Sequence, residues 1–120
     1  MTTSDLSTGV RHHDGVAVID LAGDVDTRAE SALDLAWDDA VRQDPDAVVL
    51  NFSDTGYINS TGIALIVGLL AKARGRGLPI RAFGLSQHYR EIFEITRLAD
   101  FLSIQHDEQS AVHSADRSNP

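Results

Sequence analysis

The chain has 120 residues, a formal net charge of −8 at pH 7 and no cysteine. A chain of this length forms one domain with its own hydrophobic core. The acidic balance argues against general affinity for nucleic acid or anionic membranes, and a chain without cysteine has no disulfides, thiol catalysis or thiolate metal sites.

The start of the chain does not predict a signal peptide. The first residues have neither the basic region nor the apolar core of a signal peptide, and the longest apolar run covers only residues 63–71. A bilayer span needs about 20 apolar residues. We therefore expect a cytoplasmic protein without a membrane partner, with a flexible segment at residues 1–8, a single domain at 9–115 and a flexible tail at 116–120.

The first half of the chain predicts two strands, a helix and a third strand. The strands cover residues 10–13 and 15–21, joined by a turn at Asp14-Gly15. Apolar residues at 3.6-residue spacing predict a helix over residues 27–41, begun by Asp26 as cap or by a capping box from Thr27 to Glu30. Residues 47–52 predict a central strand covered on both faces, which a turn at 53–56 ends.

The second half alternates helices with strands. Helices are expected at about residues 60–76, 87–96 and 108–115, and strands at 78–83 and 101–105. This order predicts an α/β fold of one domain, with a mixed four- to five-stranded sheet and helices mainly on one side.

Two hydroxyl residues stand where the helix at 60–76 begins. Asn59 or Ser60 is the expected N-cap, and the first N–H groups of a helix have no helical acceptor. Together with the helix dipole, these donors stabilise negative charge. A phosphoryl group on Ser60 would lie at this position, which indicates a switch rather than a catalyst.

Three separated motifs resemble the STAS domain family, named for sulfate transporters and anti-sigma factor antagonists. Residues 21–26 resemble its Gly-acidic-apolar-Asp turn, residues 57–63 its phosphorylation loop, and residues 93–98 the segment that ends its third helix. The element order agrees over residues 8–113. Two positions depart from the family pattern, because Asn59 replaces an aspartate and Arg97 replaces a glycine.

The resemblance implies a function in transcription regulation and stress signalling. A stand-alone member is an anti-sigma factor antagonist whose unmodified form binds an anti-sigma factor, often a serine kinase of the histidine-kinase-like ATPase class. That kinase would phosphorylate Ser60, with Thr61 as the less favoured acceptor, and so end the interaction. A PP2C-type phosphatase would restore it. We expect no catalytic residue, metal or cofactor in this chain, and a monomer or weak dimer.

The resemblance also implies a partner-binding surface around the same loop. Its expected members are Asp24, Asp26, Asn59, Ser60, Thr61, Gly62, Ile63, Ile66 and Val67. The apolar helix that supplies the last of these is either buried on most sides or partly exposed as the docking face.

Some residues allow other interpretations. Asp24 and Asp26 are either paired carboxylates for acid–base chemistry or metal binding or, as we favour, a helix cap and a loop acid. His12 and His13 would point to opposite sides of a strand, so they do not predict a metal site, and His106 and His113 are interpreted as surface residues. Two other functions stay open: a scaffold subunit of a larger signalling complex, and a module that binds a small anion or nucleotide.

Overall fold

A five-stranded mixed sheet forms the centre of this computed structural model, which describes residues 5–113. The tail expected at 116–120 and the end of the helix expected at 108–115 lie outside the described residues. The elements are β1 (Ser7–His13), β2 (Val16–Val25), η1 (Thr27–Ala29), α1 (Glu30–Val41), β3 (Ala47–Ile58), α2 (Ser60–Gly75), β4 (Ile80–Phe83), α3 (Gln87–Ile95), η2 (Leu98–Asp100), β5 (Ser103–Ile104) and α4 (Glu108–Val112).

The strands lie in the sheet in chain order, β1-β2-β3-β4-β5. β1 and β2 form an antiparallel hairpin, and the other neighbouring pairs are parallel. The hairpin turn places Asp14 and Gly15 at φ 55° and 81°, the pair of positive values that a tight two-residue turn requires. The α/β fold with a mixed sheet, expected from the sequence, is confirmed.

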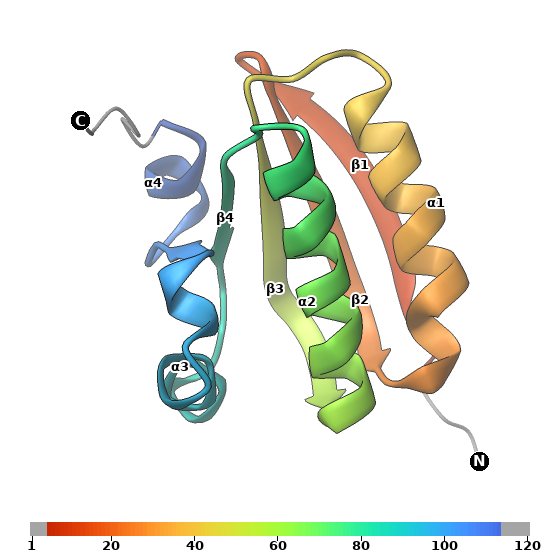
Figure 1. Cartoon of the computed structure of the whole chain (residues 1–120), viewed down its shortest axis with the longest axis vertical. Coiled ribbons are helices and arrows are strands. Elements are labelled where there is room, and N and C mark those ends of the chain that lie inside the picture. The colour runs from red at the N-terminus through yellow and green to blue at the C-terminus, as the bar shows by residue number, and fades with distance from the viewer. Residues whose placement is uncertain (1–4, 114–120) are drawn as a thin grey trace.

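The helices cover the two faces of the sheet unequally. α1 and α2 lie side by side across one face (Figure 1), and they share with α3 and η2 the larger core cluster. α4 packs on the opposite face, where Ala111 and Val112 are buried against β2, β3 and β4. Among residues 5–113, every helix falls short of the length and hydropathy that a membrane span requires.

The expected turn at residues 53–56 is wrong, because β3 continues to Ile58. The extension pairs with the end of β2, where Thr55 lies opposite Gly23 and Ile58 opposite Val25. Two register shifts in this pairing locally bend the ladder. Residues 53–56 are small or polar because this end of the sheet lies largely in solvent. For that reason the sequence alone suggested a turn there.

Both edge strands differ in length from the prediction. β1 begins at Ser7, three residues earlier than expected, and Leu6 before it is buried. Part of the segment expected to be flexible at 1–8 is therefore strand. β5 contains only Ser103–Ile104, because Phe101 and Leu102 form the turn and bend that follow η2, and Gln105 lies beyond the strand.

An ion-pair network joins β1, β2 and α4. The Arg11 guanidinium lies 2.6 Å from the Asp20 carboxylate and 2.9 Å from that of Glu108. Its hydrogen bonds lower the pKa of both carboxyl groups. The network fixes the start of α4 against the hairpin.

Candidate functional site

The start of α2 lies against the end of β2. The backbone N–H of Asn59 donates to the carbonyl of Val25 at 3.2 Å. Gly62 approaches the same carbonyl so closely that an added Cβ atom would lie 1.9 Å from its oxygen. Glycine is therefore the residue that permits this contact, and it fixes the first turn of α2 to the sheet.

Two side chains hold the segment that precedes α2. The backbone N–H of Tyr57 donates to the Asp24 carboxylate at 2.9 Å, and the N–H of Ile58 donates to the Tyr89 hydroxyl at 2.9 Å. Asp24 comes from β2 and Tyr89 from α3, so two other elements hold this end of β3. Sequence reasoning did not identify Tyr89 as a contact of this segment.

Asn59, rather than Ser60, is the N-cap of α2. Its side-chain oxygen accepts a hydrogen bond from the N–H of Gly62 at 2.8 Å, and its extended backbone precedes the helix. Ser60 is the first helical residue, and it is exposed together with Thr61. Within residues 5–113, no protein group is hydrogen-bonded to the Ser60 hydroxyl. Among the described residues, the site therefore presents an exposed hydroxyl at the capped start of α2.

Asp26 has a structural partner of its own. Its carboxylate caps η1 by accepting from the N–H of Arg28 at 3.0 Å, and it forms an ion pair with the Arg28 guanidinium at 2.6 Å. These contacts lower the pKa of Asp26. Asp24 and Asp26 thus serve different backbone groups, which supports the cap and loop-acid interpretation over paired catalytic carboxylates.

The expected docking residues of α2 divide between surface and interior. Val67 is 44% exposed, and Ile63 is half-buried. Ile66 is only 1% exposed and Gly62 is buried, because both face the sheet. These two residues support the surface from beneath and do not form part of it.

An exposed aromatic residue adds to the surface. Tyr57, 62% exposed, is the last residue but one of β3 and precedes the Asn59 cap by two positions. Large aromatic side chains at such positions supply much contact energy in protein interfaces. The phosphorylation-loop motif contained this residue, but its exposure was not evident from the sequence.

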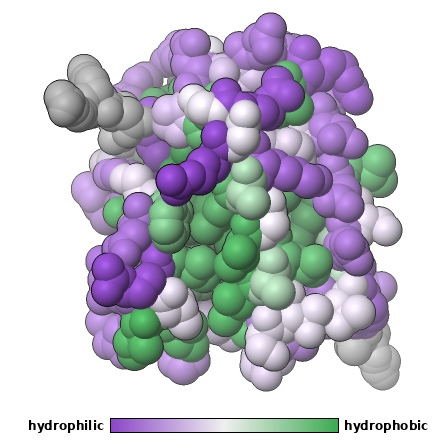
Figure 2. Space-filling model, in the orientation of Figure 1, coloured by the Kyte–Doolittle hydropathy of each residue, from purple (hydrophilic) through white to green (hydrophobic). Residues whose placement is uncertain are grey.

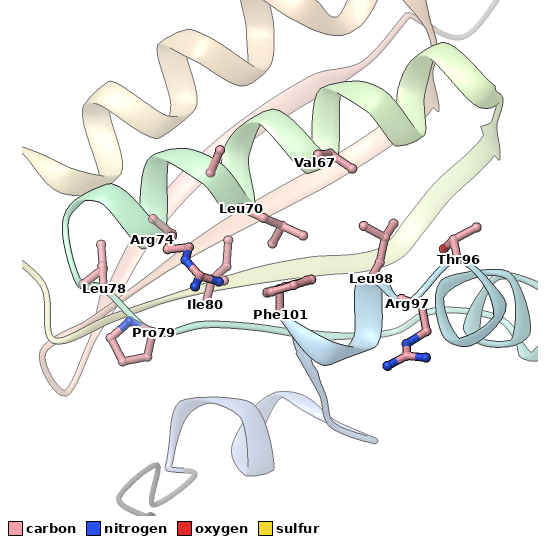
Figure 3. A pocket seen from close by; sticks show the side chains of 12 residues that line it. Val67, Leu70, Arg74, Leu78, Pro79, Ile80, Thr96, Arg97, Leu98 and Phe101 are labelled. Atoms are coloured by element: carbon pink, nitrogen blue, oxygen red, sulfur yellow. The ribbon is translucent and has the colours of Figure 1, made fainter.

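An apolar groove runs beside α2, away from the helix start. It has a volume of about 410 Å³ and lies between Val67, Leu70 and Arg74 of α2 and the η2 segment with Leu98 and Phe101 (Figure 3). Figure 2 shows apolar side chains gathered in the middle of this face. The groove joins residues far apart in the sequence, so no local pattern predicted it.

Phe101 forms one wall of this groove while remaining 55% exposed. The Arg74 guanidinium lies 5.6 Å from the centre of its ring, a cation–π contact. Val67 thus connects two exposed regions: the hydroxyl-bearing start of α2 and this groove.

Comparisons with family models and with known proteins both find similar sequences. Residues 8–104 match the family model described as "Mlab, STAS domain". An anti-sigma-B factor antagonist of Listeria monocytogenes is 32% identical over 90 residues, which cover 73% of this chain and 77% of that protein.

Solved structures share the fold. An anti-sigma factor antagonist from Mycobacterium paratuberculosis superposes with a TM-score of 0.78 at 22% identity, over 93% of this chain and 95% of the other. The Bacillus cell fate determinant SpoIIAA in its phosphorylated form gives a TM-score of 0.66 at 18% identity, over 88% and 96% of the two chains.

Proposed function

Because the chain belongs to the STAS domain family, we propose that it is an anti-sigma factor antagonist. Its role is regulatory: the unmodified protein binds an anti-sigma factor, and phosphorylation of Ser60 ends that binding. The proposed partners are a serine kinase of the histidine-kinase-like ATPase class and a PP2C-type phosphatase, in the cytoplasm.

The observation that carries the proposal is the exposed Ser60 hydroxyl in the first turn of α2. A kinase can reach this hydroxyl without unfolding the loop, and no internal hydrogen bond must break first. Phosphorylation adds about −1.5 to −2 charges at a helix N-terminus, where the dipole favours negative charge by about 0.3–1 kcal/mol. The modified protein therefore keeps its fold.

Asn59 makes the position more tolerant of the phosphate. A carboxylate at the cap would stand beside the new dianion and repel it. The amide of Asn59 caps the helix through its oxygen without adding charge. The departure from the family's aspartate thus preserves the cap and removes one source of repulsion.

Release follows from desolvation of the phosphate. An interface formed over Ser60 would have to bury a dianion, and an unpaired buried charge costs several kcal/mol. Since about 1.4 kcal/mol corresponds to a tenfold change in affinity, binding weakens by about two to three orders of magnitude. No rearrangement of the domain is required.

The proposed docking surface contains the exposed and half-exposed residues around this hydroxyl. Asp24 adds an acid to its rim, Asp26 lies there paired with Arg28, and Tyr57 and Val67 give it apolar contact area. The full set is Asp24, Asp26, Tyr57, Asn59, Ser60, Thr61, Ile63 and Val67.

The test first looks for a serine kinase of this ATPase class among the neighbouring genes and then uses that purified kinase. The purified proteins are incubated with ATP, the phosphorylated peptide is mapped, and the kinase affinity of both forms is measured. We expect labelling at Ser60 and a loss of affinity of about 100-fold or more on phosphorylation. Ser60→Ala should abolish labelling, whereas Ser53→Ala, an exposed serine near the same end of the sheet, should not. Labelling elsewhere, or equal affinities, would contradict the proposal.

A further inference from the structure

We propose that His13, Asp14 and His113 form a binding site for a divalent transition metal of the zinc type. The three side chains lie at the hairpin end of the sheet, and the proposal does not depend on the antagonist function. The sequence did not predict it, because the second imidazole comes from the other end of the chain rather than from His12.

The ligand atoms already have nearly the spacing that a metal ion requires. The Asp14 carboxylate oxygen lies 3.6 Å from Nε2 of His13 and 3.6 Å from Nε2 of His113. All three ligand atoms lie within 4.8 Å of one another. In a tetrahedral zinc site with bonds of about 2.0–2.2 Å, neighbouring ligand atoms are about 3.4 Å apart. Small side-chain rotations would therefore close the site.

The donor set suits this class of ion. Neutral imidazole nitrogen and carboxylate oxygen are common zinc ligands, and three protein ligands leave a fourth position for water. The side chains are about half exposed, so the ion can enter from solvent without opening the fold. The two imidazole rings meet edge to face rather than stacked, with centroids 5.6 Å apart.

The backbone on both sides of the site is anchored. His13 ends β1 inside the hairpin ladder, and Asp14 occupies the tight turn at φ 55°. His113 directly follows α4, whose last carbonyl groups accept hydrogen bonds from the buried Arg81 guanidinium at 2.6 Å and 3.3 Å. Ligands on rigid supports lose little conformational freedom when an ion binds. A bound ion would tie the hairpin to α4.

Zinc titration of the full chain tests the proposal. The untagged protein is stripped with EDTA, titrated with ZnCl₂ by calorimetry, and melted with and without the metal. We expect saturable one-to-one binding and a melting temperature that rises by about 3 °C or more when the metal is in large excess over its dissociation constant. Cobalt in place of zinc should give the strong visible absorption of a four-coordinate site.

Matched histidine variants assign the ligands. His13→Gln and His113→Gln should each weaken zinc binding by about tenfold or more. His12→Gln and His106→Gln change exposed histidines outside the cluster and should bind zinc as the parent does. Metal-free melting temperatures check that each variant is folded. Absence of saturable binding, or equal binding by all four variants, would overturn the proposal.

Discussion

Gly62→Ala should damage the start of α2 more than any surface change there. The new Cβ would lie 1.9 Å from the Val25 carbonyl oxygen and 2.7 Å from its carbon, whereas ordinary contact begins at 3.4 Å. These are backbone atoms of a central strand, so they cannot rotate away as the end of a flexible side chain would. The helix must move off the sheet, at a cost of about 3 kcal/mol, the upper part of the range for overpacking.

The same substitution elsewhere in the helix provides a matched control. Gly68 lies in the middle of α2, and nothing stands within 4 Å of the Cβ that alanine would add. Gly68→Ala should stabilise the protein by about 0.5–1 kcal/mol, because alanine favours the helix over glycine. One kcal/mol corresponds to about 4 °C in a domain of this size.

Thermal and urea unfolding of the two variants measures both effects. We expect a melting temperature about 12 °C below the parent for Gly62→Ala and about 2–4 °C above it for Gly68→Ala. Binding of the anti-sigma kinase should weaken only in the former, because the Asn59 cap and Ser60 move with the helix end. If Gly62→Ala unfolds at or above the parent temperature, the close approach of α2 to Val25 is refuted.

Three further predictions concern single side chains. Arg97→Gly should stabilise the fold by about 1 kcal/mol in urea unfolding, because Arg97 adopts φ 70°, where a side chain is disfavoured. Tyr89→Phe should destabilise it by about 1–3 kcal/mol by leaving a buried N–H group without its acceptor, whereas Tyr57→Phe should have almost no effect. Arg11→Met should cost about 1 kcal/mol near neutral pH and less near pH 3 in denaturation at each pH.

The pH dependence of the Arg11→Met effect follows from the two carboxylate partners of Arg11. Arg11 holds the pKa values of Asp20 and Glu108 below their ordinary values of 3.8 and 4.5. Their stabilisation is therefore complete above those values and is lost as the pH falls through the lowered ones. A cost that stays constant with pH would contradict this network. Loss of stability in Arg97→Gly would contradict the prediction for that residue. Equal effects of Tyr89→Phe and Tyr57→Phe would contradict the prediction for the tyrosines.

Local signals were sufficient for the order of elements. The Asp14-Gly15 turn and Asp26 as a cap each act within a few residues, so the sequence displays them directly. The apolar run of β3 likewise indicated a strand buried on both faces. These signals depend on backbone chemistry that does not require knowledge of the neighbouring elements.

Features made by distant residues were not visible in the sequence. The end of β3 contains residues typical of a turn, and only its pairing with β2 makes it a strand. The Tyr89 hydroxyl and the wall of the groove at Phe101 acquire their roles from packing between elements. At the candidate site, sequence reasoning indicated the exposed hydroxyl but included Ile66, whose side chain faces the core.

The arrangement of the sheet has a consequence for how the protein is made. Since each strand is added beside the one before it, no later segment has to insert between strands already in place. A nascent chain leaving the ribosome can assemble β1, β2 and β3 and seat the first turn of α2 before the remainder is synthesised. The Tyr89 contact is added only when α3 emerges. The surface proposed for regulation can thus begin to form before synthesis is complete, and it is finished when α3 supplies Tyr89.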